Sequence, residues 1–402
     1  MKNIEVCFKE ISSYIEQYEN KVSENNAKDV ISTFKAEWEK TIGYMPDNKD
    51  MGEEYGKTLL IYSVGIYEFN DTSEKDIKQL ADKIETYDNN KNVKFNFEIK
   101  EALYLNLGLC WNKIGKVYNS YALAAFKKYI YYLITRSSNM SYQPIAYAFR
   151  PCSKFLFEAL INESLNLSSP SRFNDPFDCP ILELLNNDDE ISHLIRQAYN
   201  ECLKIGCFSS NTKLPIWDGK SIITGKKGEQ QEGQPEYLNE LMWAHYADSH
   251  RGICIKYHFP NSLSKLGDET HNIVAYFKDV IYDNKDISKY STQNTISLYD
   301  AFFLKGKQWS YENELRYLYF NLNGKEGYES IKIENCIEAV YFGVKCSKED
   351  KDTIMNILRD KRYVKTDMNK KTREEFEIEL YNMIIDKEHF GQIKSVKIET
   401  KP

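Results

Sequence analysis

The stretch that decides the fold of the second half of the chain is WSYENELRYLYF (309–320). It is rich in aromatic and apolar residues and contains no Gly or Pro, which predicts a β-strand. Because alternate side chains of a strand project from one face, we expect Glu312, Glu314 and Arg316 to lie together. Two carboxylates beside a guanidinium are typical of a reaction centre. They are also typical of a solvated face with a structural ion pair, so the residue types alone leave both interpretations open.

Composition excludes several classes of protein. The chain has 402 residues, of which 42% are hydrophobic, enough for one large domain or two smaller ones with real cores. A net charge of -7 gives no overall attraction to nucleic acid or to an anionic membrane. The N-terminal residues carry charges throughout and no apolar run is long enough to span a bilayer, so we expect a cytoplasmic protein with no membrane contact. Nine scattered Cys without a CxxC motif, and six His without metal-ligand spacing, predict neither disulfides nor a metal site.

Residues 1–140 are expected to be helical, because apolar residues recur at helical intervals in 4–18, 30–42 and 55–69. The segment 72–75 is a candidate helix cap. The run EIKEALYLNLGLCWNKIGKVYNSYALAAFKKYIYYLI (98–134) follows and resembles a tetratricopeptide helix pair. Its resemblance rests on small and aromatic residues at packing positions, namely Tyr104, Leu107, Gly108, Trp111, Gly115, Ala122, Ala125 and Phe126. An irregular helical bundle is the alternative, and in either case this half suits a sensing or interaction module.

The polar stretch 135–143 predicts a domain boundary, giving a helical domain at 1–140 and an α+β domain at 141–402. Residues after it change in pattern. Strands are expected at 144–150, 165–168, 253–259, 274–282, 337–344 and 395–398, and helices at 151–161, 237–248, 296–307 and 347–360.

Three motifs in the second half resemble a bacterial family known only as a domain of unknown function. They are AFRPCSKFLFEALINESLNLSSPSRFNDPFDCP (148–180), ELMWAHYADSHRGICIKYHF (240–259) and KGKQWSYENELRY (305–317). The first contains the FNDPFD sequence after which we refer to the family. The resemblance covers roughly residues 144–345, and it implies no function by itself.

The order of Arg150, Ser209 and the Glu312-x-Glu314 pair resembles that of ADP-ribosyltransferases. This resemblance implies a mixed β-sheet of that type, with NAD as substrate. Arg150 would hold the NAD phosphates or ribose, and Ser209 would brace the site. Glu314 would stabilise the cationic ribose as nicotinamide leaves, and Glu312 would activate an acceptor. The alternative for Arg150 is a surface ion pair, and a serine at a strand end is common.

Further residues are expected around NAD: Phe173, Asn174, Asp175, Trp243, His245 and Arg316. Asn174 and Asp175 belong to the FNDPFD loop, and Arg316 would keep a neighbouring carboxylate ionised. For His245 a hydrogen-bonded core histidine is the competing interpretation, because it shares a helical face with Leu238, Leu241 and Met242.

The resemblances together suggest an NAD-consuming effector, either a bacterial toxin or an anti-phage defence protein. It would transfer ADP-ribose to an unknown protein or nucleic acid, and a protein partner would bind the helical half. The competing hypothesis is a non-catalytic ligand-binding or protein-interaction module on the same fold.

Overall fold

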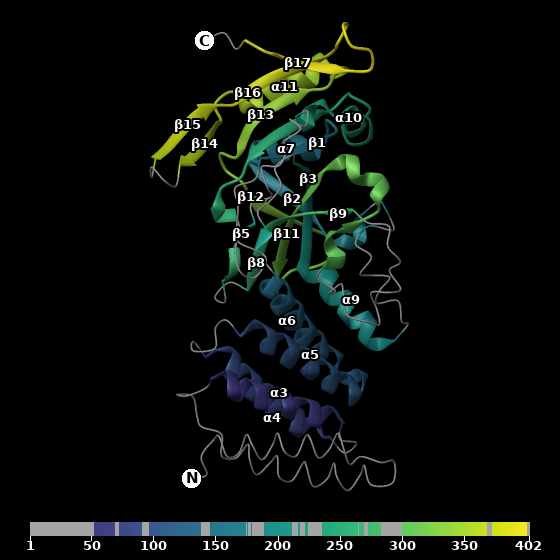
Figure 1. The fold of residues 1–402 in the computed structure, drawn as a ribbon, viewed down its shortest axis with the longest axis vertical. Helices are drawn as coiled ribbons and strands as arrows, with labels where there is room; N and C mark the ends of the chain where they lie inside the picture. The colour runs from purple at the N-terminus through teal and green to yellow at the C-terminus, as the bar shows by residue number, and fades with distance from the viewer. Residues whose placement is uncertain are drawn as a thin grey trace. The chain divides into compact units, whose positions relative to one another are not determined.

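The computed structural model describes residues 52–68, 72–90, 96–137, 145–173, 175, 178, 189–210, 216–217, 222–223, 235–263, 265–268, 272–282, 300–367 and 372–399. The chain divides into two compact units, one formed by Met1–Ser137 and Leu185–Tyr199 and the other by Ser138–Leu184 and Asn200–Pro402. Helices make up the described N-terminal half and a large mixed sheet dominates the C-terminal half (Figure 1). The segment 185–199 lies in the predicted second domain but joins the helical unit.

The helical unit contains α3 (Glu53–Glu68), α4 (Glu74–Asp88), α5 (Phe97–Lys113), η2 (Lys116–Tyr118), α6 (Asn119–Ser137) and most of α9 (Glu190–Cys202). Ser73 caps α4, and its hydroxyl and backbone N–H form a capping box with Asp76. The helices predicted at 4–18 and 30–42 lie outside the described residues.

The helix pair predicted at 98–134 is present as α5 and α6 (Figure 1). Gly108 allows their close approach, because a Cβ atom there would lie 2.5 Å from the Phe126 ring. The chain turns between them at Gly115, whose φ of 128° suits glycine. Tyr104 and Trp111 are buried in this helical core, as their spacing predicted.

The second unit is organised around an 11-stranded mixed sheet, counted over the described residues. Its main order is β17-β16-β13-β6-β1-β3-β11-β8-β7, with β2 pairing β3 and β12 pairing β2. The strands are β1 (Ile145–Arg150), β2 (Ser164–Ser168), β3 (Leu203–Ser209), β6 (Ile253–His258), β7 (Lys265–Asp268), β8 (Ile273–Asp279), β11 (Glu314–Asn321), β12 (Tyr328–Lys332), β13 (Ile337–Phe342), β16 (Glu379–Ile385) and β17 (Ile393–Lys397). Smaller two-stranded pairs are β4 (Ile216–Trp217) with β5 (Ile222–Ile223), β9 (Ile281–Tyr282) with β10 (Leu304–Lys305), and β14 (Arg362–Asp367) with β15 (Thr372–Glu377).

Helices cover both faces of the sheet near β1. Ala146 and Ala148 pack in a core with α7 (Lys154–Asn162) and α11 (Lys348–Leu358). Tyr147 and Phe149, which alternate with them, pack with α10 (Glu240–Tyr246) in a separate core. The strand therefore separates two hydrophobic layers, and the α10 side is the one that carries the candidate site.

Several predicted elements differ from the observed ones. Residues 307–312 form the 3-10 helix η8 (Lys307–Glu312), so the strand predicted from 309 begins only at Glu314. The described part of the helix predicted at 296–307 is instead the 3-10 helix η7 (Asp300–Phe303), followed by β10. Phe155 in α7 is exposed, whereas its neighbour Leu156 is buried. Remaining short 3-10 helices are η3 (Pro170–Arg172), η4 (Glu236–Leu238) and η5 (Asn261–Leu263).

Candidate active site

Strand register brings three side chains into one row. Ser209 lies opposite Tyr147 of β1 on one side and opposite Glu314 of β11 on the other. Directly opposed residues on neighbouring antiparallel strands are close enough for their side chains to touch. The end of β3 and the start of β11 are therefore aligned with β1 by backbone pairing alone, which explains how residues 147, 209 and 314 meet.

A cavity of 190 Å³ opens at this row, within the second unit. Five of its fourteen lining residues are aromatic and five are charged. The lining residues are Tyr147, Ala148, Phe149, Arg150, Phe173, Asp178, Cys207, Phe208, Ser209, Met242, Tyr246, Lys305, Glu312 and Glu314. The structure thus brings together Arg150, Ser209, Glu312 and Glu314, and it adds Phe173 from the FNDPFD loop.

Glu312 reaches the cavity by a different route from the one its sequence predicted. It is the last residue of η8, and Asn313 after it adopts a left-handed conformation with φ 42° and ψ 50°. Asparagine tolerates this conformation better than most residues. The reversal at Asn313, rather than strand alternation, directs Glu312 and Glu314 to the same cation.

That cation is Lys305, which the sequence analysis did not select as a site residue. Its Nζ lies 2.5 Å from Glu312 Oε2 and 3.0 Å from Glu314 Oε2. It also lies 3.5 Å from Asp178 Oδ2. Lys305 is 7% exposed, and it pairs with Tyr282 in the short parallel ladder of β10 and β9. One buried ammonium therefore holds three carboxylates at the charged end of the cavity.

Arg316 completes this charge cluster behind the cavity wall. Its Nε donates to Glu314 Oε1 at 2.8 Å and its Nη2 donates to Asp178 Oδ1 at 2.5 Å. Its Nη1 donates to the Phe302 carbonyl. The residue is fully buried and does not line the cavity, so the expected direct contact with NAD is replaced by a role in orienting carboxylates.

The pKa values of Glu312 and Glu314 are shifted in opposite directions. Burial favours the neutral form of Glu314, but Arg316 and Lys305 outweigh it and hold the pKa below the ordinary value. For Glu312 burial prevails over the bonds from Lys305 and Tyr246, so its pKa is raised. Burial alone would lower the pKa of Lys305, but the Glu314, Asp178 and Glu312 carboxylates raise it. At neutral pH Glu314 is thus firmly ionised, while Glu312 is the better proton acceptor of the two.

Two tyrosines position the carboxylate pair. Tyr246 Oη donates to Glu312 Oε1 at 2.5 Å, and Tyr282 Oη accepts the backbone N–H of Glu314 at 2.7 Å. The sequence signal for Tyr246 was the WAHYA motif, in which we selected Trp243 and His245 instead. For Asp178 the signal was the last residue of FNDPFD.

Ser209 and Arg150 place polar groups in the cavity wall that can form hydrogen bonds to a ligand. Ser209 is 1% exposed, and its Oγ has no hydrogen-bond partner among the residues that the structure describes. Arg150 is half-buried and donates to the carbonyl oxygens of Phe149 and Cys207, the latter at 3.5 Å. A buried hydroxyl without a partner is costly in the free protein, so it is suited to bond a ligand.

Among the described residues, Asp175, Trp243 and His245 do not line the cavity although the sequence selected them. Asn174 lies outside the described residues, and the Asp175 carbonyl accepts the Asp178 N–H within the loop. Trp243 is fully buried, donates from Nε1 to the Tyr237 carbonyl at 2.8 Å, and packs edge-on to Phe149. His245 is exposed, so the expectation of a core histidine is wrong. Helix α10 buries Met242 and Trp243 rather than the face containing Leu241 and His245.

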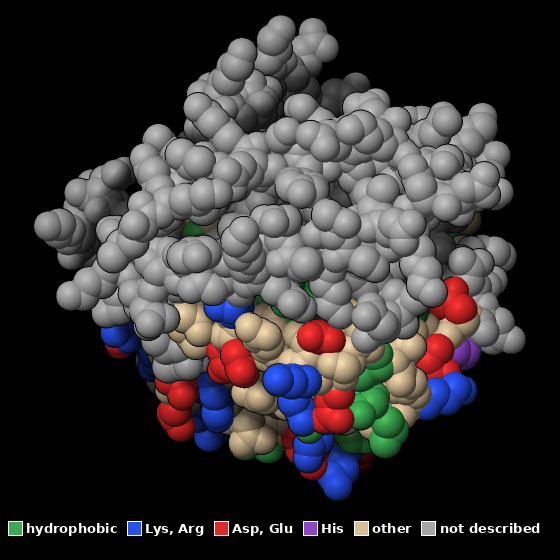
Figure 2. Space-filling model, turned by 90° about the horizontal axis from the view of Figure 1, so that it is seen from below, with side chains coloured by type: hydrophobic (Ala, Val, Ile, Leu, Met, Phe, Trp, Pro, Cys, Tyr) green, Lys and Arg blue, Asp and Glu red, His purple; other side chains and the backbone are tan. Residues whose placement is uncertain are grey.

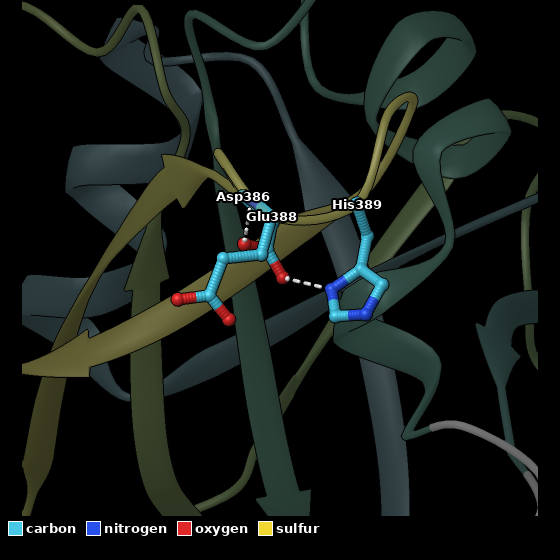
Figure 3. A group of neighbouring side chains, drawn as sticks. All are labelled: Asp386, Glu388 and His389. Carbon is cyan, nitrogen blue, oxygen red and sulfur yellow. Dashed lines mark hydrogen bonds and ion pairs between the residues drawn. The ribbon is translucent and has the colours of Figure 1, made fainter.

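A second group of ionisable residues lies in the turn between β16 and β17. Asp386 Oδ2 faces His389 Nδ1 at 3.0 Å, with Glu388 beside them (Figure 3). Lys394 Nζ already lies 3.3 Å from Asp386, and both Glu388 and His389 are exposed. The Glu388 backbone N–H, His389 and Lys394 lower the pKa of Asp386 to about 2. We interpret this cluster as stabilising the turn.

Figure 2 shows the surface charge on one face of the described residues. In the face shown in Figure 2, the described Lys and Arg side chains are interspersed with Asp and Glu side chains. Interspersed charges of this kind do not mark an anionic or cationic docking surface. Among the described residues, none of the helices has the length and apolarity needed to cross a bilayer.

Comparison with known proteins gives a family for part of this site. Residues 242–317 match DUF2971, a protein family of unknown function. The DUF2971 segment supplies Tyr246, Lys305, Glu312 and Glu314 to the cavity, whereas Arg150 and Ser209 lie outside it. No curated protein and no solved structure matches the chain.

Proposed function

We propose that the second unit binds NAD, cleaves its nicotinamide–ribose bond and transfers ADP-ribose to an acceptor on an ADP-ribosyltransferase-like fold. The observation that carries this proposal is the convergence of Arg150, Ser209, Glu312 and Glu314 on one cavity with aromatic walls. The cavity is smaller than the roughly 300 Å³ of pockets that enclose a drug-sized ligand. It therefore suits the nicotinamide end of the dinucleotide, with Arg150 available for a phosphate or ribose.

In this mechanism the C–N glycosidic bond breaks and its electron pair leaves with nicotinamide. Positive charge then develops on the ribose, and the ionised Glu314 stabilises it. Asp178, Glu312 and Glu314 exceed Lys305 and Arg316 by one negative charge, and Arg150, which lines the same cavity, supplies a third cation. The acceptor bonds to the ribose carbon and loses a proton, for which Glu312 is the suitable base because its pKa is raised.

The test is nicotinamide release from NAD by the full chain. The full chain is used because Leu185–Tyr199 belongs to the first unit and a cut near residue 140 would separate it from its neighbours. Glu314→Gln keeps size and hydrogen bonding but removes the charge, and it is expected to lower turnover about a hundredfold, equivalent to about 3 kcal/mol. Glu312→Gln is expected to impair transfer to an acceptor more than hydrolysis.

Glu338→Gln is the matched control. Glu338 is also a buried carboxylate facing a lysine, with Oε1 2.9 Å from Lys256 Nζ, but it does not line the cavity. Its turnover should stay within about twofold of the unmodified protein, because it removes charge away from the reacting centre. Equal turnover by Glu314→Gln and the unmodified protein would refute the role given to Glu314.

A non-catalytic binding module is the second candidate. It is favoured by the complete pairing of Glu314, whose Oε1 bonds Arg316 and whose Oε2 bonds Lys305. On this alternative the cluster is structural and only the aromatic cavity and Ser209 bind a ligand. Saturable NAD binding without nicotinamide release, in the presence or absence of cell extract, would favour it.

We also propose a biological setting for either activity. Helices α5 and α6 would act as a tetratricopeptide-like unit that binds a protein partner and so controls a toxin or anti-phage effector. The spacing of packing residues along these two helices supports this. A partner-binding surface on the first unit is tested by measuring NAD turnover before and after exposure to phage-infected cell extract.

A further inference from the structure

Glu236 is a buried carboxyl group just outside the cavity. It begins η4 and is 3% exposed. Its Oε1 accepts a hydrogen bond from Asn313 Nδ2 at 2.8 Å. Its Oε2 is buried and has no hydrogen-bond partner among the residues described by the structure. A carboxyl group in such surroundings is more stable when it carries a proton.

The partner of Glu236 is the residue that joins the two site glutamates. Asn313 adopts the left-handed conformation between Glu312 and Glu314. Its carbonyl accepts the backbone N–H of Ser210 at 2.9 Å, next to the Ser209 hydroxyl. One side-chain bond from Glu236 therefore anchors the backbone segment that places both carboxylates relative to β3.

A second bond runs in parallel with the first. Asn239 Nδ2 donates to the Tyr311 carbonyl at 2.7 Å, and the Asn239 side chain also accepts the Met242 N–H that begins α10. Segment 236–239 thus holds segment 311–313 at two points. We refer to these two bonds together as the 236–239 clasp.

We propose that Glu236 is a positioning residue whose proton keeps the 236–239 clasp closed, so that loss of the proton loosens the cavity wall carrying Glu312 and Glu314. What the cavity binds rests on the function proposed above, but the clasp itself does not. The inference makes the geometry of the site pH-dependent through a group that does not contact the ligand.

The pKa of Glu236 is shifted in the direction that this proposal requires. Burial raises its pKa to about 7, against a smaller lowering effect of Asn313. Among the described residues, Tyr147 on β1 and Cys254 on β6 are titratable groups that interact electrostatically with Glu236. Burial raises the pKa of both, so they are uncharged at neutral pH. Asn313, the hydrogen-bond partner of Glu236, lies between the two acidic residues Glu312 and Glu314 in the sequence.

The pH range of the effect follows from the two pKa values. In an open clasp Glu236 is solvated and returns toward its ordinary value of 4.5, whereas in the closed clasp it is about 7. Closure is therefore most favourable below 4.5. It weakens by up to tenfold per pH unit as the pH rises toward 7 and then levels off.

The experiment is hydrogen–deuterium exchange of the full chain from pH 5 to 8, expressed as protection relative to intrinsic exchange. The reporters are the amides of Ser210 and Glu314, which donate to Asn313 O and Tyr282 Oη. We expect their protection to fall between pH 5 and 7 in the unmodified protein. In Glu236→Gln the slope of log protection against pH should decrease by up to one unit, because the amide does not titrate.

Glu338→Gln serves as the control and should keep the full pH slope, since Glu338 faces Lys256 and Lys365 elsewhere in the sheet. An unchanged slope in Glu236→Gln, or a slope lost equally in Glu338→Gln, would overturn the inference. NAD affinity is measured over the same pH range. If NAD binds, its pH dependence should be reduced only in Glu236→Gln. If NAD does not bind, the proposed function fails while exchange still decides the role of Glu236.

Discussion

Two buried lysines show what distinguishes the candidate site from a structural ion pair. In the first unit, Lys100 Nζ lies 3.0 Å from Asp88 Oδ1, and this carboxylate also binds Lys128, Tyr104 and Tyr132. In the second unit, Lys305 meets three carboxylates at the end of a cavity. Burial favours a neutral Asp88, yet Lys128 and Lys100 overcome this and lower its pKa.

The difference lies in charge balance and access. Around Asp88 the cations and hydroxyls outnumber the carboxylate, and the cluster is buried among helices except for the partly exposed Lys128. Around Lys305 the carboxylates are in excess, and the buried Ser209 hydroxyl, which has no hydrogen-bond partner among the described residues, lines the same cavity. Burial and ion pairing alone therefore do not indicate chemistry. Unused hydrogen-bonding capacity at a cavity does.

The largest expected effect on stability comes from replacing Lys305 or Lys100. Lys305→Met and Lys100→Met should each lower the free energy of unfolding by up to about 3–5 kcal/mol, because buried carboxylates lose one of their counter-charges. Urea unfolding followed by circular dichroism measures this for both variants. If Lys305→Met costs less than about 1 kcal/mol, the carboxylates around it are already hydrated, and the buried cluster described here is not maintained in solution.

A smaller effect is expected from the tyrosines that bond the two clusters. Tyr246→Phe removes a hydrogen bond to Glu312 and should cost about 1.5–3 kcal/mol, as should Tyr132→Phe at Asp88. Because Tyr246 lowers the pKa of Glu312, its loss should raise that pKa further.

The pH dependence of the unfolding free energy distinguishes Tyr246→Phe from Tyr132→Phe. A carboxyl group with a raised pKa in the folded state contributes stability that is present at low pH and lost as the pH rises. In Tyr246→Phe this loss should extend to a higher pH than in the unmodified protein. Unfolding free energies at several pH values are the measurement. Identical pH profiles for Tyr246→Phe and the unmodified protein would show that the tyrosine does not tune Glu312.

The smallest effect on stability is expected at Ser209. Ser209→Ala removes a buried hydroxyl without a partner, so stability should stay unchanged or rise by up to about 1 kcal/mol. NAD affinity should nevertheless fall about five- to tenfold, the equivalent of one hydrogen bond. Ser63→Ala is the control in the first unit. The Ser63 hydroxyl donates to the Leu60 carbonyl and accepts from Asn106, so its loss should cost about 1 kcal/mol.

Local patterns predicted much of the fold. The strands predicted at 144–150, 253–259 and 337–344 are present as β1, β6 and β13, and the helix predicted at 347–360 is present as α11, capped by Ser347. The aromatic run at 309–311 favoured a strand by composition. The left-handed Asn313 and the 3-10 turn before it overrode that preference, and no periodicity signals such a reversal.

The site was predictable where residues stand at strand ends and unpredictable where tertiary contacts select them. Arg150, Ser209 and Glu314 follow from strand order, whereas Lys305 precedes the strand in a segment predicted to be helical. In α10 the helical pattern favoured the face with His245, but the sheet packs against Met242 and Trp243. The buried side of so short a helix is decided by its neighbours rather than by its own sequence.

The most direct test of the central claim is a crystal structure of the full chain carrying Glu314→Gln with NAD bound. The account predicts the nicotinamide end of NAD in the cavity, the Ser209 hydroxyl hydrogen-bonded to it, and residue 314 facing the ribose. NAD bound away from the cavity, or a cavity still empty at saturating NAD, would contradict the account. The Lys305 cluster would then be a structural ion-pair network like the one around Asp88.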